Sequence, residues 1–246
     1  MPLSKPLDCP SIVDDFHAFI RSPSFPCVGA KSALARDRMR IVVARDVASA
    51  WDDLAIIDAI HSLAADYRAD PVLFQSLAIL FPASAPMDEA RFETHLWERV
   101  QSLTDKDDWL GSRPDPRVSD DPDDSHFSLS FGGEAFFVVG LHPGSSRPAR
   151  RYAVPVLVFN LHDQFEQLRA QGRYEKLRGS IIERDVALAG SVNPMLSRHG
   201  TISEARQYSG RAVGAEWQCP FARQPIAKDP FADLLQAADA DMAQAA

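Results

Sequence analysis

The residues of this chain best suited to metal or acid–base chemistry are its histidines and a group of arginines that follows one of them. His142 stands at the end of an apolar run, directly before Pro143. The loop after it contains a serine and three arginines that could bind an anion: Ser146, Arg147, Arg150 and Arg151. An imidazole binds iron through a neutral ring nitrogen, and guanidinium groups bind carboxylates or phosphates through paired hydrogen bonds. The pattern predicts a metal ligand beside an anion-binding loop.

The predicted strand pairing restricts which histidines can act together. Gly132-Gly133 is typical of a tight hairpin turn, so the numbers of facing residues sum to about 265. In this register His126 lies near the end of the sheet from which His142 emerges. His162 instead lies beside the Gly132-Gly133 turn. This position is about ten residues of strand from His142, or roughly 34 Å at the usual rise per residue. We therefore expect His126 and His142 to share one end of the sheet, and His142 and His162 not to bind one metal ion.

His142 also ends an apolar face, because the period of two places it on the same side of its strand as Phe136 and Val138. A histidine at the rim of a dry aromatic surface suits a proximal haem ligand, and the nearby arginines suit the haem propionates. Two other interpretations remain open. A histidine before Pro-Gly can be an ordinary turn residue, and an arginine-rich loop can be solvated or can bind a phosphate or carboxylate.

Other candidate residues have a structural and a functional interpretation each. His126 could hydrogen-bond to bound oxygen as a distal group, or it could simply open a strand. His162 precedes Asp163 and could begin or cap a helix. Cys27 and Cys219 could each supply a thiolate ligand, although small buried cysteines are common.

Hydrophobic spacing predicts an α+β fold in a single domain: an antiparallel β-meander packed with helices. The loop between the second and third strands is too short for a parallel crossover. The expected helices are 14–21, 48–65, 87–103, 163–171 and 174–189, and the expected strands are 39–44, 126–131, 134–141 and 154–160. Residues 106–125 have a loop composition, and the Ala- and Asp-rich tail from Ala227 is typical of a marginal or frayed helix.

Bulk composition narrows the class of protein. The chain has 246 residues and a net charge of −8, which argues against nucleic acid and anionic membranes as partners. Its three cysteines show no metal or disulfide spacing, and no stretch approaches the length of a membrane span. With no signal peptide at the N-terminus, we expect one domain over residues 1–246 in the cytoplasm.

Several motifs together resemble the YqcI/YcgG family. They are FPCVGAK (25–31), FGGEAFFVVGLHPGSSR (131–147), VFNLHDQFEQLR (158–169), GSVNP (190–194), ARQYSGR (205–211) and CPF (219–221). The similarity covers most of the chain, and the set is specific although no single motif is. The resemblance implies a haem-dependent N-hydroxylase of a guanidino group, with a b-type haem, dioxygen, an electron donor and an arginine-like substrate.

Combining the family motif with the sheet geometry, we expect His142 to bind the haem iron. The residues expected to bind the rest of the cofactor are Ser146, Arg147, Arg150 and Arg151. The expected catalytic residues are His126 and Glu134. Glu134 and Glu204 are carboxylates that could pair with a guanidinium substrate, or form ordinary ion pairs. The alternative function is a haem-binding sensor or carrier without turnover. A third is a cofactor-free hydrolase or transferase that holds an anion on the arginine-rich loop.

Overall fold

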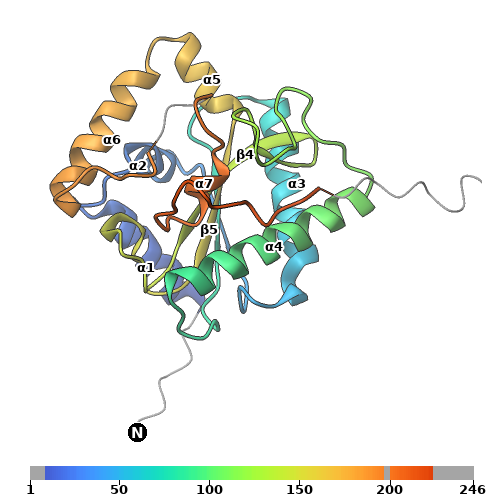
Figure 1. Cartoon of the computed structure of the whole chain (residues 1–246), viewed down its shortest axis with the longest axis horizontal. Coiled ribbons are helices and arrows are strands. Elements are labelled where there is room, and N and C mark those ends of the chain that lie inside the picture. Colours follow the sequence, from blue (N-terminus) through green and yellow to red (C-terminus); the bar gives the residue numbers. More distant parts are fainter. Residues whose placement is uncertain (1–8, 197–199, 224–246) are drawn as a thin grey trace, which may run out of the picture.

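A computed structural model describes residues 9–196 and 200–223 as one layered α/β domain (Figure 1). The helices are α1 (Cys9–Arg21), α2 (Val28–Ala35), α3 (Asp53–Ala69), α4 (Glu89–Trp109), α5 (Asp163–Ala170), α6 (Tyr174–Ala189) and α7 (Ala205–Tyr208), with short 3₁₀ turns at Ala50–Asp52 and Pro148–Arg150. The strands are β1 (Met39–Val43), β2 (Ser76–Leu80), β3 (Leu129–Phe131), β4 (Glu134–Leu141) and β5 (Val156–Leu161). The predicted tail from Ala227 lies outside the described residues.

The sheet is mixed, which corrects the predicted antiparallel meander. Its strand order is β1-β2-β5-β4-β3. The predicted meander of β3, β4 and β5 is antiparallel, but β2 pairs with β5 on one side and lies parallel to β1 on the other. The parallel pair is possible because α3 forms the crossover between β1 and β2. Strand β2 was missed because all five of its residues are buried, so it lacks the alternation that marks a half-exposed strand.

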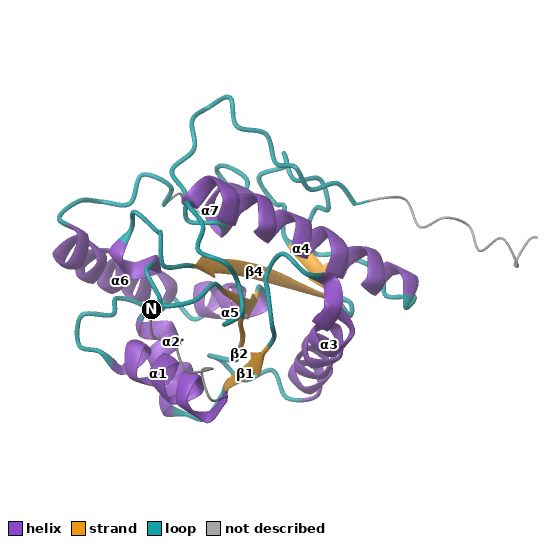
Figure 2. Ribbon diagram, turned by 90° about the horizontal axis from the view of Figure 1, so that it is seen from below, coloured by secondary structure: helices purple, strands orange, loops and turns teal. Residues whose placement is uncertain are grey.

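Helices cover the sheet on both faces (Figure 2). On one face α3 and α4 pack over the larger core, which includes Phe136 and Val138 of β4 together with Phe92 and Leu96 of α4. On the opposite face lie α1, α2 and α6. Because side chains alternate along a strand, the odd-numbered residues of β4 face this second group of helices.

The hairpin at Gly132-Gly133 has the predicted register. Leu129 pairs with Phe136, and Phe131 pairs with Glu134. Both glycines have positive φ angles, +56° and +81°, which a tight turn of this kind needs. However, β3 begins only at Leu129, so the predicted strand from residue 126 is too long and His126 belongs to the preceding loop.

Helix α6 has the predicted bounds and ends at Gly190, which adopts the left-handed conformation of a C-cap. Helix α4 is longer than predicted and includes the first residues of the expected loop. It begins after Asp88, whose carboxylate accepts a hydrogen bond from the backbone N–H of Arg91, as in a typical N-cap.

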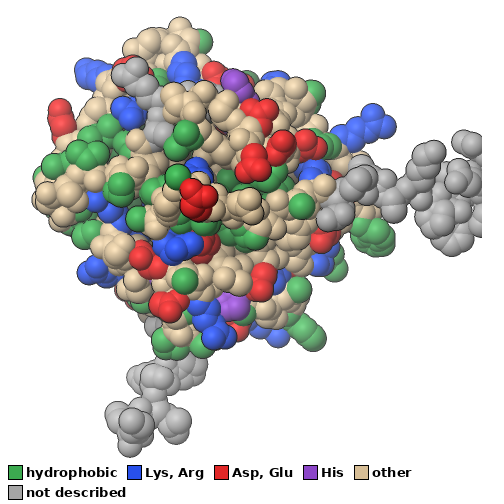
Figure 3. All heavy atoms as spheres, viewed as in Figure 1, with side chains coloured by type: hydrophobic (Ala, Val, Ile, Leu, Met, Phe, Trp, Pro, Cys, Tyr) green, Lys and Arg blue, Asp and Glu red, His purple; other side chains and the backbone are tan. Residues whose placement is uncertain are grey.

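Within residues 9–196 and 200–223, no helix has the length and apolar character that a membrane span requires. Acidic and basic side chains are interspersed over the face of the molecule shown in Figure 3. This mixture is what the overall charge, with acids moderately outnumbering bases, leads one to expect.

Candidate functional site

An apolar cavity lies against the sheet face opposite α3 and α4. Its floor is formed by Phe137 and Val139 of β4, Asn160 of β5 and Ser76 of β2. These positions are neighbours across the sheet, since Phe137 pairs with Asn160, which pairs in turn with Ser76. The cavity has a volume of about 270 Å³, close to the lower end of the usual range for small-molecule sites.

Helices α5 and α6 supply most of the apolar wall. Leu177 and Ile181, four residues apart, lie on one side of α6, and the adjacent Ile182 also borders the cavity. Phe165 and Leu168 do the same from α5. None of the described residues of α6 is fully buried, because the inner side of this helix borders the cavity rather than a filled core.

His162 stands where β5 ends and α5 begins. Its backbone N–H donates to the carbonyl oxygen of Ala135 at 2.8 Å, which extends the β4–β5 pairing by one residue. As predicted, it begins a helix, but its side chain does not cap α5; it is buried and lines the cavity. Among the described residues that border the cavity, it is the sole histidine.

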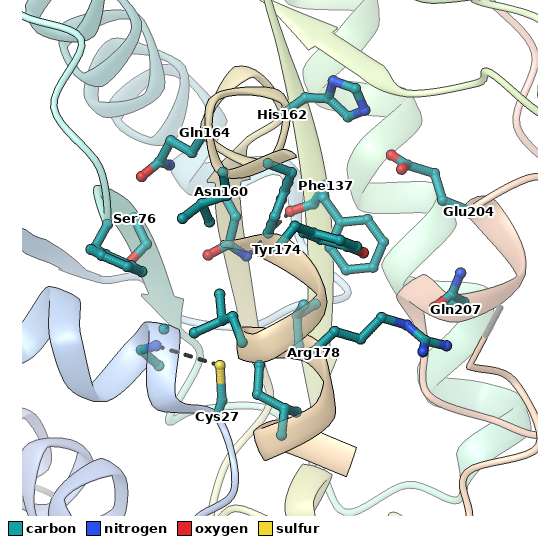
Figure 4. A pocket seen from close by; sticks show the side chains of 18 of the residues that line it. Cys27, Ser76, Phe137, Asn160, His162, Gln164, Tyr174, Arg178, Glu204 and Gln207 are labelled. Carbon is teal, nitrogen blue, oxygen red and sulfur yellow. Dashed lines mark hydrogen bonds between the residues drawn. The ribbon is translucent and has the colours of Figure 1, made fainter. Parts of the chain in front are cut away.

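Cys27 borders the cavity from the N-terminus of α2. Its sulfur accepts a hydrogen bond from the backbone N–H of Ala30 at 3.4 Å and so caps the helix. Burial raises the pKa of the Cys27 thiol, which therefore stays protonated near neutral pH. In Figure 4 Cys27 lies at the lower end of the view and His162 at the upper end, with the rings of Phe137 and Tyr174 between them.

Glu204 is the acidic residue of the cavity wall, and it is 8% exposed. The hydroxyl of Tyr208 donates to its Oε1 at 2.6 Å, and the hydroxyl of Ser128 donates to the same oxygen at 2.7 Å. Burial raises the pKa of Glu204 to about 7, because these hydrogen bonds only partly replace the lost hydration. The cavity therefore contains a carboxyl group that changes charge near physiological pH.

Two arginines also border the cavity. Arg169 forms an ion pair with Glu166, and its guanidinium stacks over the ring of Tyr174 with 4.5 Å to the ring centroid. Arg178 projects into the view of Figure 4 and forms no ion pair with any carboxylate in the part of the chain that the structure describes. Of the two, Arg178 is the one available to bind an anionic group of a ligand.

The predicted iron ligand His142 does not border this cavity. It is 1% exposed and its ring stacks on Phe92 of α4, with 4.3 Å between the centroids. Burial lowers the pKa of His142, and its Nδ1 has no hydrogen-bond partner among the described residues. The period of two explains the placement, because His142 follows the even-numbered face of β4, the face that α4 covers.

The residues of the predicted anion-binding loop are engaged within the protein and do not border the cavity, although Ser146 and Arg147 line a separate small pocket beside Asn193. The backbone N–H and hydroxyl of Ser146 both donate to Glu89, each at 2.8 Å. Arg147 binds Asp185 of α6. Arg151 donates to loop carbonyl oxygens.

Arg150, the remaining arginine of this loop, links two elements of the fold. Its guanidinium donates to three backbone carbonyl oxygens, those of Gly140, Gln207 and Tyr208. Burial lowers the pKa of Arg150 to about 10, so it remains charged at neutral pH. These bonds join the end of β4 to α7, and we infer that Arg150 positions the α7 segment that contains Glu204 and Gln207.

The two predicted catalytic residues also lie away from the cavity wall. The side chain of His126 is 67% exposed and its Nδ1 lies 3.3 Å from Asp124. Glu134 is buried, and it accepts a hydrogen bond from Arg117 at 2.7 Å near the hairpin turn. Because β3 ends before it reaches His126, the expected proximity of His126 and His142 has no basis in the strand pairing.

In the part of the chain that the structure describes, no three or more histidine, cysteine, aspartate or glutamate side chains form a group that could hold a metal ion.

A family model for the YqcI/YcgG family matches residues 16–222. The chain belongs to this family. The sequence motifs that resemble the family converge on the cavity, since Cys27, Phe137, Asn160, His162 and Gln207 come from four of them. No curated protein and no solved structure matches this chain, so the family is established by its model alone.

The signal that could have identified the cavity in advance is this same set of motifs. The sequence had indicated candidates among the cavity residues: His162, mainly as a residue that begins a helix, and Glu204, as a partner for a guanidinium substrate. The apolar residues of α6 gave no such signal, because their spacing is typical of any amphipathic helix.

Proposed function

We propose that this YqcI/YcgG family member is a haem-dependent oxygenase that hydroxylates a nitrogen of a guanidino group, and that the cavity on the α6 side of the sheet forms part of its haem and substrate site. The observation that supports this proposal best is a buried imidazole, His162, in a largely apolar cavity built from the family motifs. A bound haem would need apolar walls and a protein ligand for its iron, and these residues would supply both.

The residues around the cavity fit a haem group in their chemistry. His162 offers an imidazole nitrogen, whereas burial keeps the Cys27 thiol protonated and so disfavours it as a thiolate ligand. Arg178 is suited to a propionate, since arginine binds carboxylates through paired hydrogen bonds. His162 would therefore hold the haem iron, instead of His142, which packs against Phe92 outside the cavity.

When bound, the haem would supply the activation of dioxygen, with electrons from an external donor. The overall reaction converts an N–H bond of the substrate to N–OH and reduces the other oxygen atom to water, with protons taken up from solvent. The protein's own residues hold and orient the substrate and exclude water, which is the usual division of work between an enzyme and its cofactor. The apolar residues of α5 and α6 exclude water, and Glu204 provides a hydrogen-bond acceptor for a cationic substrate.

The assignment can be tested with two histidine variants. We expect His162→Ala to lose most of its haem and its Soret band after purification and reconstitution with hemin. We expect His142→Ala to retain the wild-type haem content and spectrum, since that ring lies in the core. A haem-loaded His162→Ala protein with an unchanged spectrum would contradict the assignment to His162.

Product analysis tests the activity itself. Haem-loaded protein supplied with a reductant, oxygen and an arginine-like guanidine should give an N-hydroxylated product that mass spectrometry detects. A protein that binds haem yet turns over none of a panel of guanidino compounds would instead be the haem-binding sensor or carrier. A colourless protein that takes up no hemin would contradict both functions.

A further inference from the structure

Glu204 is a buried carboxylate without a cationic partner. No lysine, arginine or histidine in the described part of the chain forms an ion pair with it, and Arg169, which contributes a distant favourable charge, is engaged with Glu166. An uncompensated buried carboxylate is costly, so proteins normally pair it or replace it. Since no described side chain pairs with the ionised form of Glu204, a cationic ligand that enters the cavity would meet this carboxylate without a competing ion pair.

The two oxygens of Glu204 differ in their surroundings. Oε1 accepts both short hydrogen bonds, from Tyr208 and from Ser128, and these two residues are themselves buried. Oε2 accepts no hydrogen bond from the residues that the structure describes. The fixed Oε1 therefore orients the carboxylate and leaves Oε2 as the acceptor for a ligand in the cavity (Figure 4).

The aromatic side chains of the cavity favour a flat cation. The ring of Phe137 lines the cavity and packs edge-on against Tyr208, at 5.4 Å between centroids. The ring of Tyr174 lines it too and already stacks with one guanidinium, that of Arg169. Guanidinium groups stack on aromatic faces and are more weakly hydrated than ammonium groups, so they lose less on entering an apolar cavity.

From this arrangement we propose that Glu204 is the specificity-determining residue of the cavity, and that it selects a guanidinium cation by accepting one N–H bond at Oε2. This inference deepens the proposed function, on which it rests for the nature of the site. Tyr208 and Ser128 are positioning residues that act through Glu204. A hydrogen bond from one guanidinium nitrogen to Oε2 leaves the other nitrogens of the group free to react.

The test compares three small probes: methylguanidinium, methylurea, which has a similar planar shape but no charge, and methylammonium, which has the same charge but is not planar. Binding is measured by calorimetry on the protein as purified, with its haem content recorded, and again after saturation with hemin. The variants are Glu204→Gln and the matched control Glu183→Gln, which alters an exposed carboxylate of α6 outside the cavity wall.

We expect wild type and Glu183→Gln to bind methylguanidinium about tenfold or more tightly than methylurea, since hydrogen bonds between charged groups are worth more than neutral ones. Methylammonium should fall between them. In Glu204→Gln the preference for methylguanidinium should shrink to about twofold or disappear.

Two results would overturn the inference. One is a Glu204→Gln protein that keeps the wild-type preference; the other is a wild-type protein that does not distinguish methylguanidinium from methylurea or binds neither. Because the probes are tested with and without added hemin, failure to take up haem would count against the proposed function alone. Loss of discrimination in a haem-loaded, catalytically active protein would count against Glu204 alone.

Discussion

Replacing Glu204 by glutamine should stabilise the protein at neutral and alkaline pH. Glutamine has the same shape, and its carbonyl oxygen can accept the bonds from Tyr208 and Ser128, but it needs no ionisation inside the protein. The wild-type carboxyl does, because its pKa lies at about 7 in the folded state against an ordinary value of 4.5. The free energy of unfolding of the wild type therefore contains a pH-dependent term that the variant lacks.

The size and sign of that term follow from the two pKa values. A carboxyl whose pKa is raised by folding binds more protons in the native state between pH 4.5 and pH 7, so the stability that it contributes is present below pH 4.5 and is lost as pH rises to about 7. At 1.36 kcal/mol for each pH unit, a difference of about 2.5 units corresponds to about 3 kcal/mol. The quantity to compare is the free energy of unfolding of Glu204→Gln minus that of the wild type. This difference should be larger above pH 7 than at pH 4.5, by up to about 3 kcal/mol.

Urea denaturation of wild type and variant between pH 4.5 and 8 measures this difference directly. Taking the difference at each pH cancels the titration of every other group. Glu183→Gln is the control, and it should follow the wild type across the range. A difference between Glu204→Gln and wild type that stays constant from pH 4.5 to 8 would refute the argument, because it would mean that the carboxyl titrates equally in both states.

Three further predictions follow from the same contacts. The affinity for methylguanidinium should rise with pH and level off above about pH 7, as Glu204 ionises, whereas Glu204→Gln should bind the probe with a flat pH profile. Gly140→Ala should lower the free energy of unfolding by about 1–3 kcal/mol in urea denaturation, because a Cβ there would lie 2.7 Å from Phe92; an unchanged midpoint would show that α4 yields easily. Arg147→Ala should cost about 3 kcal/mol in the same assay, because it leaves Asp185 unpaired in a largely buried position, and a loss below 1 kcal/mol would mean that the pair is solvated.

The features that the sequence predicted well are those set by neighbouring residues. The two glycines at the hairpin fixed the turn and thereby the register of β3 against β4. Helix α6 was predicted with its observed bounds, since its charged and apolar residues alternate with a helical period and Gly190 ends it. Both depend on short-range backbone geometry, which a stretch of sequence specifies by itself.

Strand β2 shows where local patterns were insufficient. Ser76–Leu80 is a short apolar run, and such a run is equally compatible with a buried strand and with a turn of buried helix. Its place between β1 and β5 changes the sheet from antiparallel to mixed, and that place depends on how α3 packs across the sheet. The fold class was therefore predicted in part only, since the pairing of distant strands has no local signature.

The location of the site was also decided by tertiary structure. The sequence by itself determined the family motifs, the alternation along β4 and the candidate residues, including His162, Cys27 and Glu204. It did not determine which face of the sheet is filled by helices and which retains a cavity. Both faces of β4 are apolar. The packing of α4 against the even-numbered face buries His142, whereas the odd-numbered face borders the cavity beside His162. A cavity depends on all the elements that surround it, so the sequence of one strand cannot specify it.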